Sequence, residues 1–236
     1  MESKSLTDAK ARLFTAPATW SGGFYELIIH LGRRSDQRLQ EALKLLWLHD
    51  NLDGCWLNPA MEPQDNKRIE PTLRQPVKLH GIALLSAPEQ AAAPDAQEAA
   101  LPGAQKAACL SQIKRQKLTD GKLLGIAKPD WLRLGLPMGA LATIYDVGRF
   151  PEPGIGNEGS RQWREKLDQW LVEIARSICK SVPYDFAMIG HELDAEQLFA
   201  RLNNNDAPED RDWGYLQGNL QMLDGTLEWH PPTTYS

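Results

Sequence analysis

Two stretches of the sequence, residues 24–57 and 141–191, share one order of elements: an apolar strand, an amphipathic helix and a second apolar strand. In the helix of the second stretch, apolar residues recur every three or four positions from Trp163 to Ile178. A helix with one apolar stripe must bury that stripe, and a sheet face is its usual partner in a strand–helix–strand unit. The repeated pattern therefore predicts an α/β (α+β) core of two layers.

The part of the chain between these units has a different pattern, which predicts strands joined by turns. The expected strands cover residues 77–85, 106–117 and 123–134. Thr119-Asp120-Gly121 is a turn sequence between the second and the third of them. We therefore expect an antiparallel β meander inserted between the two βαβ units.

Near the C-terminus, Asp224-Gly225 separates two apolar runs, residues 220–223 and 226–229, which is typical of a β-hairpin. Together, these patterns predict two βαβ units in a ferredoxin-like two-layer sandwich, with the inserted meander and a C-terminal hairpin. Right-handed crossover connections would place both long helices on the same face of one sheet.

The domain organisation follows from where these patterns begin and stop. Residues 1–20 are expected to be a flexible lead-in, and residues 21–236 a single α/β domain. Within that domain, residues 86–105 contain eight alanines and three prolines and no aromatic residue. Such a composition buries too little apolar area to offset the entropy of ordering, and predicts a mobile loop, with a short alanine-rich helix as the alternative. Ser35 and Ser160 are expected to cap the two long helices. Asp194, with Gln197 three residues on, resembles a capping box for a short helix through Leu202.

Composition limits the compartment and the chemistry. The N-terminal residues lack the apolar run of a secretory signal, and no apolar stretch approaches the roughly 20 residues that span a bilayer. The three cysteines form no CxxC pair, so neither a disulfide framework nor a cysteine-based zinc site is expected. His191-Glu192 begins like a zinc-protease motif, but Ala195 stands where the second histidine is required. We therefore expect a cytoplasmic protein with no membrane association, no metal and no cofactor.

The acidic residues are concentrated in one segment. Between Asp185 and Asp212 there are eight acidic and two basic residues, which give this segment a net charge of −6. The whole chain has a net charge of −5, so the remaining residues together carry +1. Residues 106–122 contain five basic residues and one acidic residue. An uneven field of this kind can steer a charged partner over about 10 Å, although solvated surfaces with no partner are the simpler interpretation.

Three residues of the predicted sheet are candidates for acid–base catalysis. His30 and Glu26 share one face of the first strand. In the expected sheet the strand from Tyr184 runs antiparallel beside it, which would bring Asp185 close to His30. A carboxylate beside an imidazole can orient a general base. No nucleophile is recognisable nearby, so a structural histidine remains the alternative.

The sequence Gly154-Ile155-Gly156-Asn157-Glu158-Gly159 matches the glycine pattern of dinucleotide-binding loops. Gly154, Gly156 and Gly159 would let backbone N–H groups approach a phosphate at the start of a helix. The glycines begin seven residues after Val147, however, and Glu158 would place a negative charge beside the phosphate. A plain loop is therefore the competing interpretation.

The absence of a catalytic motif and the charge pattern together favour a non-enzymatic binding protein with a basic protein partner. The residues expected to bind that partner are Asp206, Glu209, Asp210, Asp212 and Trp213. An immunity-type inhibitor of a toxin or enzyme is a concrete example, because an acidic surface speeds capture of a cationic partner. Basic residues are not interleaved with aromatic ones, so a nucleic-acid partner is not expected. The alternatives are an enzyme or small-ligand binder, and a homo-oligomeric subunit.

Overall fold

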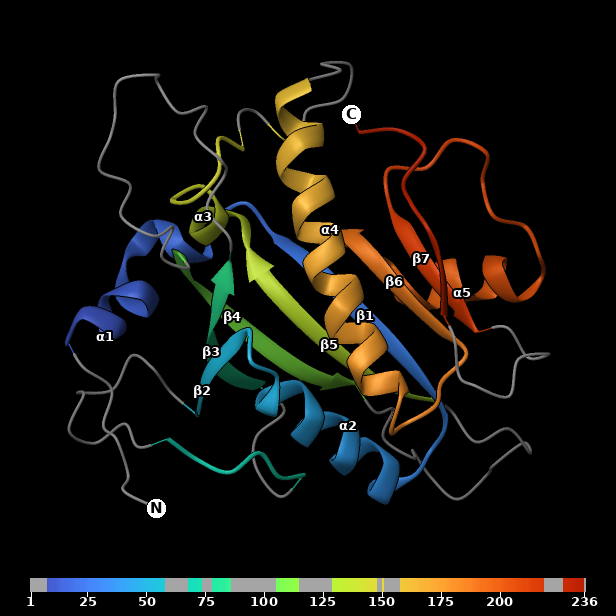
Figure 1. The fold of residues 1–236 in the computed structure, drawn as a ribbon, viewed down its shortest axis with the longest axis horizontal. Helices are drawn as coiled ribbons and strands as arrows, with labels where there is room; N and C mark the ends of the chain where they lie inside the picture. The colour runs from blue at the N-terminus through green and yellow to red at the C-terminus, as the bar shows by residue number, and fades with distance from the viewer. Residues whose placement is uncertain are drawn as a thin grey trace, which may run out of the picture.

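The computed structural model describes residues 8–57, 68–73, 78–85, 105–114, 129–147, 150, 158–218 and 227–235. Within these ranges the strands form one antiparallel sheet of eight strands, in the order β2-β3-β4-β5-β1-β6-β7-β8 (Figure 1). The strands are β1 (Phe24–Arg33), β2 (Leu52–Trp56), β3 (Lys78–Leu85), β4 (Gln105–Lys114), β5 (Pro129–Pro137), β6 (Phe186–His191), β7 (Gly214–Gly218) and β8 (Leu227–His230). The expected mixed α/β architecture is confirmed at this level.

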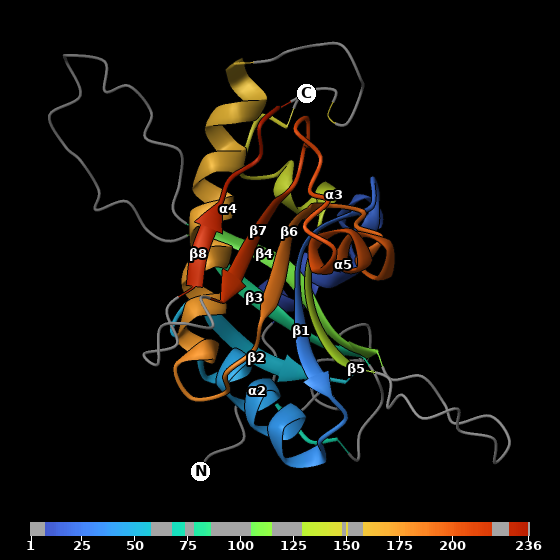
Figure 2. The same ribbon diagram turned by 90° about the vertical axis from the view of Figure 1, so that its right-hand side faces the viewer.

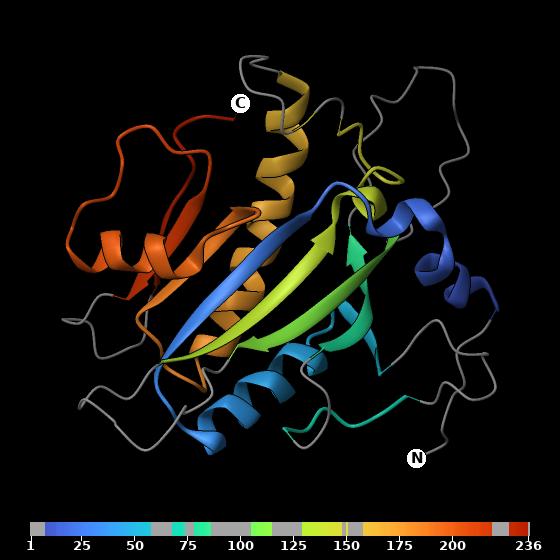
Figure 3. The ribbon, with the colours of Figure 1, turned by 180° about the vertical axis from the view of Figure 1, so that it is seen from behind.

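Five α-helices and one 3-10 helix accompany the sheet in the described residues. They are α1 (Asp8–Thr15), η1 (Pro17–Trp20), α2 (Asp36–Leu48), α3 (Met138–Leu141), α4 (Glu158–Cys179) and α5 (Ala195–Asn203). The two long helices, α2 and α4, lie on the same face of the sheet, as expected (Figure 1). The edge-on view of Figure 2 and the rear view of Figure 3 show α5 on the opposite face.

Strand β1 lies inside the sheet and is buried on both faces. Leu27 and Ile29 belong to the large core under α2 and α4, whereas Ile28 belongs to a smaller cluster with residues next to α5. A strand covered on both sides needs apolar residues at successive positions rather than strict alternation. This explains why a continuous run such as Leu27-Ile28-Ile29 forms a central strand here.

The expected strand at residues 141–147 is wrong. The chain leaves the sheet where the Met138 N–H donates to the Gly23 carbonyl at 3.0 Å. It then forms α3, which ends at Leu141, and a series of turns follows that helix. A short apolar run is compatible with either a strand or a buried helical turn, so its period alone could not decide between them. The strand that precedes α4 is β5 instead, and both β5 and β6 pair antiparallel with β1. These two strands therefore run in the same direction with β1 between them.

The specific ferredoxin-like arrangement is not confirmed. All neighbouring strands are antiparallel, and β2, which follows α2, is separated from β1 by β3, β4 and β5. The inserted meander is present, because β3 pairs with β4 and β4 pairs with β5. The meander lies between β1 and β2 in the sheet. In the expected arrangement it would instead have followed a βαβ unit whose two strands stayed together.

The remaining expectations have mixed outcomes. The C-terminal hairpin pairs β7 with β8, so its first strand is residues 214–218, whereas residues 220–223 lie outside the described residues. The expected mobile loop also lies outside them, apart from residue 105 at the start of β4. Part of the expected lead-in forms α1 and η1, and Phe14 there packs edge-on against Trp56 with ring centroids 6.0 Å apart.

One of the two caps expected for the long helices is present. Ser35 caps α2, since its hydroxyl accepts a hydrogen bond from the Arg38 N–H at 3.3 Å. Ser160 is not the cap of α4, because that helix begins at Glu158. The Ser160 hydroxyl donates instead to the Tyr235 carbonyl at 2.8 Å, and so joins α4 to the end of the chain.

Candidate protein-binding surface

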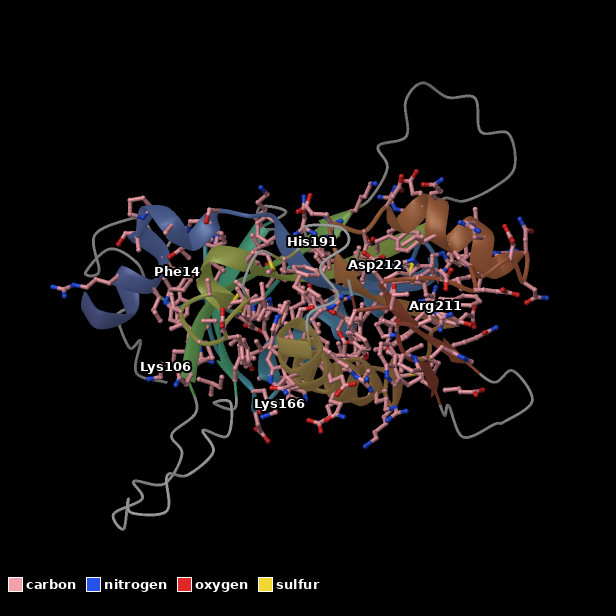
Figure 4. The ribbon with its side chains drawn as sticks, turned by 90° about the horizontal axis from the view of Figure 1, so that it is seen from above. Phe14, Lys106, Lys166, His191, Arg211 and Asp212 are labelled. Atoms are coloured by element: carbon pink, nitrogen blue, oxygen red, sulfur yellow. The ribbon has the colours of Figure 1, made fainter. Side chains whose placement is uncertain are left out.

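Residues 204–213, here called the acidic loop, connect α5 to β7. Asp206, Glu209, Asp210 and Asp212 are all exposed on it. Figure 4 shows Arg211 and Asp212 toward one end of the molecule, with Phe14 and Lys106 toward the other end. The acidic loop is therefore remote from the start of β4, where the basic segment of the sequence begins.

The first part of the acidic loop is closed by the end of α5. Asn205 adopts a left-handed conformation with φ of 54°, and the Asp206 N–H donates to the Arg201 carbonyl at 2.9 Å. The Arg201 Nε donates to the Asp206 carbonyl at 3.2 Å and lies 3.4 Å from the Asp206 Oδ2. Asparagine tolerates positive φ better than most residues, so the sequence at this turn suits its geometry.

The C-terminal segment holds the middle of the acidic loop. The Thr233 hydroxyl accepts from the Arg211 N–H at 2.8 Å and donates to the Glu209 carbonyl at 2.8 Å. The Thr233 N–H donates to the Arg211 carbonyl at 2.9 Å. These contacts satisfy backbone groups that would otherwise need water, and they connect two segments that are distant in sequence.

The basic side chain of Arg211 supports the backbone of the loop. Its Nη2 donates to the Pro231 carbonyl at 2.8 Å, and its Nη1 donates to the Pro208 carbonyl at 3.4 Å. Its guanidinium lies over the ring of Tyr215, 5.2 Å from the centroid. Its charge is thus directed at two carbonyls and an aromatic ring.

A second arginine holds the loop from beneath. Arg164 on α4 is fully buried, and its Nη2 donates to the carbonyl of Asp212. Its Nε lies 3.4 Å from the hydroxyl of Tyr25, which in turn donates to Oδ1 of Asp168 at 2.6 Å. Burial raises the pKa of Asp168 to about 7, and the hydrogen bond from Tyr25 and the charge of Arg164 oppose this shift.

Few ion pairs offset the charge of this region. Within the described residues, the acidic segment 185–212 forms two salt bridges, Lys114–Glu196 at 3.0 Å and Arg201–Asp206 at 3.4 Å. The side chains in both pairs are at least 40% exposed, and exposed pairs contribute little to stability. Glu209, Asp210 and Asp212 form no salt bridge with any described residue. Their charges face solvent.

Trp213 does not lie on this surface. It is 7% exposed and packs in the smaller core cluster with Met188 and Tyr215. Gly190 leaves room for Trp213, because a Cβ at position 190 would lie only 2.8 Å from the Trp213 Cβ and would clash with it. The ring anchors the end of the acidic loop to the sheet, because a buried tryptophan fixes the backbone that carries it.

The acid–base candidates are only partly brought together. Strand β6 pairs antiparallel with β1, with His30 opposite Phe186, which confirms the expected pairing. His30 is buried between aromatic rings, with centroids 3.9 Å from Phe199 and 4.6 Å from Trp131. Burial lowers the pKa of His30, and the charge of the exposed Asp185 opposes this effect.

Glu26 belongs to a different environment from His30. The two are four residues apart on β1, which corresponds to about 13 Å along a strand. The Glu26 Oε2 lies 2.9 Å from the Arg133 Nη2, and burial raises the pKa of Glu26 to about 7 despite that neighbouring charge. Glu26 therefore pairs with an arginine, and the three candidates do not form one catalytic group.

Among the residues that the structure describes, the other candidate groups form no second site. Gly154 and Gly156 lie outside the described residues, and Gly159 lies in the first turn of α4. The three cysteines form no disulfide, and burial raises the pKa of each thiol, which favours the unreactive protonated form. Among the described residues, no cluster of histidine, cysteine or carboxylate side chains could hold a metal ion.

Three residues that build the surface were not expected from the sequence. Arg164 and Asp168 are four residues apart on α4, within the stretch that carries the apolar stripe. Two charged residues on one side of such a helix were a signal in the sequence that could have indicated a buried polar pair. Thr233 had no such signal, because its role depends on where the chain end lies in space.

No protein-family model, curated protein or solved structure matches this chain. Among the described helices, none combines the length and the apolar character needed to cross a membrane.

Proposed function

We propose that this chain is a non-enzymatic, cytoplasmic binding protein that recognises a basic surface of another protein through the acidic loop. The observation that carries this proposal is the contrast between the side chains of the loop and its backbone. The carboxylates of Glu209, Asp210 and Asp212 face solvent, whereas the backbone beneath them is held by Arg164, Arg211 and Thr233.

Such an arrangement suits binding for an energetic reason. Ordering a flexible loop costs free energy at the moment of association, so a loop that is already held retains more of its interaction energy as affinity. Exposed carboxylates of one sign also attract a cationic partner before contact and raise the association rate. An immunity-type inhibitor of a basic toxin or enzyme is one class that uses this physics.

The test compares two variants that remove the same amount of charge. The first replaces Asp206, Asp210 and Asp212 by Asn and Glu209 by Gln. The control replaces four exposed acidic residues outside the loop, Glu41, Asp50, Glu70 and Glu173. A basic protein captured from native lysate at low salt would then be titrated against both variants and the original protein over a range of salt concentrations.

The loop variant should associate more slowly, with a weaker dependence on salt, while the control keeps most of its association rate. Both variants should unfold at similar denaturant concentrations, because exposed charges contribute little to stability. Equal binding by the two variants would refute the proposal, since net charge alone would then explain the capture.

A further inference from the structure

The side chain of Arg164 is completely buried although it carries a charge. Aromatic rings surround its guanidinium, with Phe150 at 4.9 Å, Tyr235 at 5.0 Å and Tyr25 at 5.8 Å from the respective centroids. A buried charge is costly unless hydrogen bonds and neighbouring groups compensate for it. The contacts that compensate for Arg164 therefore indicate why this residue occupies a core position.

Those contacts lie in three separate parts of the chain. The guanidinium approaches the Tyr25 hydroxyl of β1, the Asp212 carbonyl of the acidic loop and the Tyr235 ring of the C-terminal segment. Ser160, one turn earlier on α4, also donates to the Tyr235 carbonyl. Arg164 thus lies where the sheet, the acidic loop and the end of the chain meet.

The hydrogen bond to Asp212 is informative because of what lies on either side of it. The Asp212 side chain is exposed, whereas its carbonyl accepts a hydrogen bond from inside the protein. The next residue, Trp213, is buried in the core on the other face of the sheet. The backbone at Asp212 is therefore held from inside the protein while its side chain faces solvent.

The Tyr25–Asp168 pair in turn holds Arg164. Since the Tyr25 hydroxyl donates its proton to Asp168, its oxygen presents lone pairs toward Arg164 Nε. The charges of Asp168 and Arg164 also attract each other. A planar guanidinium donates from three nitrogens in a rigid fork, whereas a lysine ammonium carries three rotatable donors on a single nitrogen.

We propose that Arg164 is a positioning residue for binding, which fixes the conformation of residues 211–213 so that the Asp212 carboxylate faces the partner. This inference rests on the proposed function of the acidic loop. Arg164 itself touches no partner, since it is buried, and acts only through the backbone of the loop.

The first test is amide hydrogen exchange followed by mass spectrometry on Arg164→Lys, which keeps the charge but not the fork of donors. Exchange in residues 209–214 should become at least about tenfold faster, because the backbone of the loop opens more often without this contact. The matched control is Ile174→Val, a mild core truncation further along α4. It should lower overall stability without accelerating exchange in the loop. Unchanged exchange in Arg164→Lys, or equal acceleration in both variants, would overturn the proposal.

The second test measures binding with a decalysine peptide at low salt as the basic probe. Arg164→Lys should bind it several-fold more weakly than the original protein, although its exposed charges are the same. Binding equal to that of the original protein would overturn the positioning role. The variant that neutralises the four carboxylates of the loop should bind weakly while keeping slow exchange at residues 209–214. Full binding by that variant would refute the proposed function of the loop instead, so the two failures are distinguishable.

Discussion

The Tyr25 hydroxyl donates a 2.6 Å hydrogen bond to the Asp168 Oδ1, and both side chains are buried between β1 and α4. This pair places a polar group inside an otherwise apolar layer. Within the described residues, the second carboxyl oxygen, Oδ2, has no hydrogen-bond partner. Desolvation therefore dominates, and it raises the pKa of Asp168 to about 7.

Tyr25→Phe should lower the free energy of unfolding, and by more at pH 8 than at pH 5. Asp168 is mostly protonated at pH 5 and mostly ionised at pH 8, and the ionised form depends more on the lost donor. The loss should be roughly 1–3 kcal/mol at the higher pH. Urea denaturation at the two pH values measures it. Tyr184→Phe is the control, because the Tyr184 hydroxyl donates to the Ala175 carbonyl rather than to a carboxylate, so its effect should not change with pH.

Glu26→Gln should reduce the loss of stability that accompanies rising pH. Burial raises the pKa of Glu26 from 4.5 to about 7, so between these values the unfolded chain is ionised while the folded chain keeps its proton. The stabilising contribution of the protonated form is complete below pH 4.5 and is lost as the pH rises to 7.

The free energy of unfolding of Glu26→Gln relative to the original protein should therefore increase over this window and then level off. The increase should be of the order of a few kcal/mol at most. The buried Asp168 is present in both proteins and cancels in the difference. A difference that stays flat across this window would contradict the prediction.

Trp163→Ala should destabilise the protein by roughly 3–5 kcal/mol, as expected for a large core truncation. The indole is 4% exposed and packs edge-on against Tyr25, with ring centroids 5.5 Å apart. Gln169→Ala on the exposed side of the same helix should change the free energy of unfolding by less than about 0.5 kcal/mol. Equal denaturation midpoints for the two variants would show that this side of α4 is not a core surface.

The three thiols should resist modification in the folded protein. Cys55, Cys109 and Cys179 are buried, and burial raises the pKa of Cys55 to about 12. An aromatic disulfide reagent at pH 8 should therefore label none of them until urea unfolds the chain, at which point all three should react. A cysteine introduced at exposed Gln169 should react at once and shows that the reagent is active. Rapid labelling of the original protein would mean that one of the three sites opens readily.

Parts of this structure could be predicted from local sequence because they depend on nearby residues. The stripe from Trp163 to Ile178 predicts α4, the capping pattern of Asp194 and Gln197 predicts the start of α5, and alternation with turn residues predicts the meander. Asp194 does cap α5, since its side chain accepts from the Gln197 N–H at 3.3 Å. Exposure of the carboxylates at residues 206–212 also followed from their composition, because unpaired charges are too costly to bury.

The region after β5 shows where local patterns fail. Residues 141–147 are apolar enough for a strand, but the contacts that place α3 come from η1 and residues 21–23, far away in sequence. Gly139, for example, lies so close to the Ala18 carbonyl that a Cβ there would be 1.7 Å from it. An apolar run is stable in either conformation, so the choice belongs to the packing of distant segments.

What the sequence determined by itself was the long helices, most of the strands, the segregation of charge and the exposure of the acidic loop, because helix periodicity, turn chemistry and the cost of desolvating a charge act over a few residues. What only the tertiary structure decided was the order of the strands and the surroundings of each side chain. The pairing of β5 and β6 with β1, the burial of Trp213, and the meeting of Arg164 with Asp212 and Tyr235 each join residues that are far apart along the chain. Such contacts form only when several elements pack at once, and no local pattern specifies them.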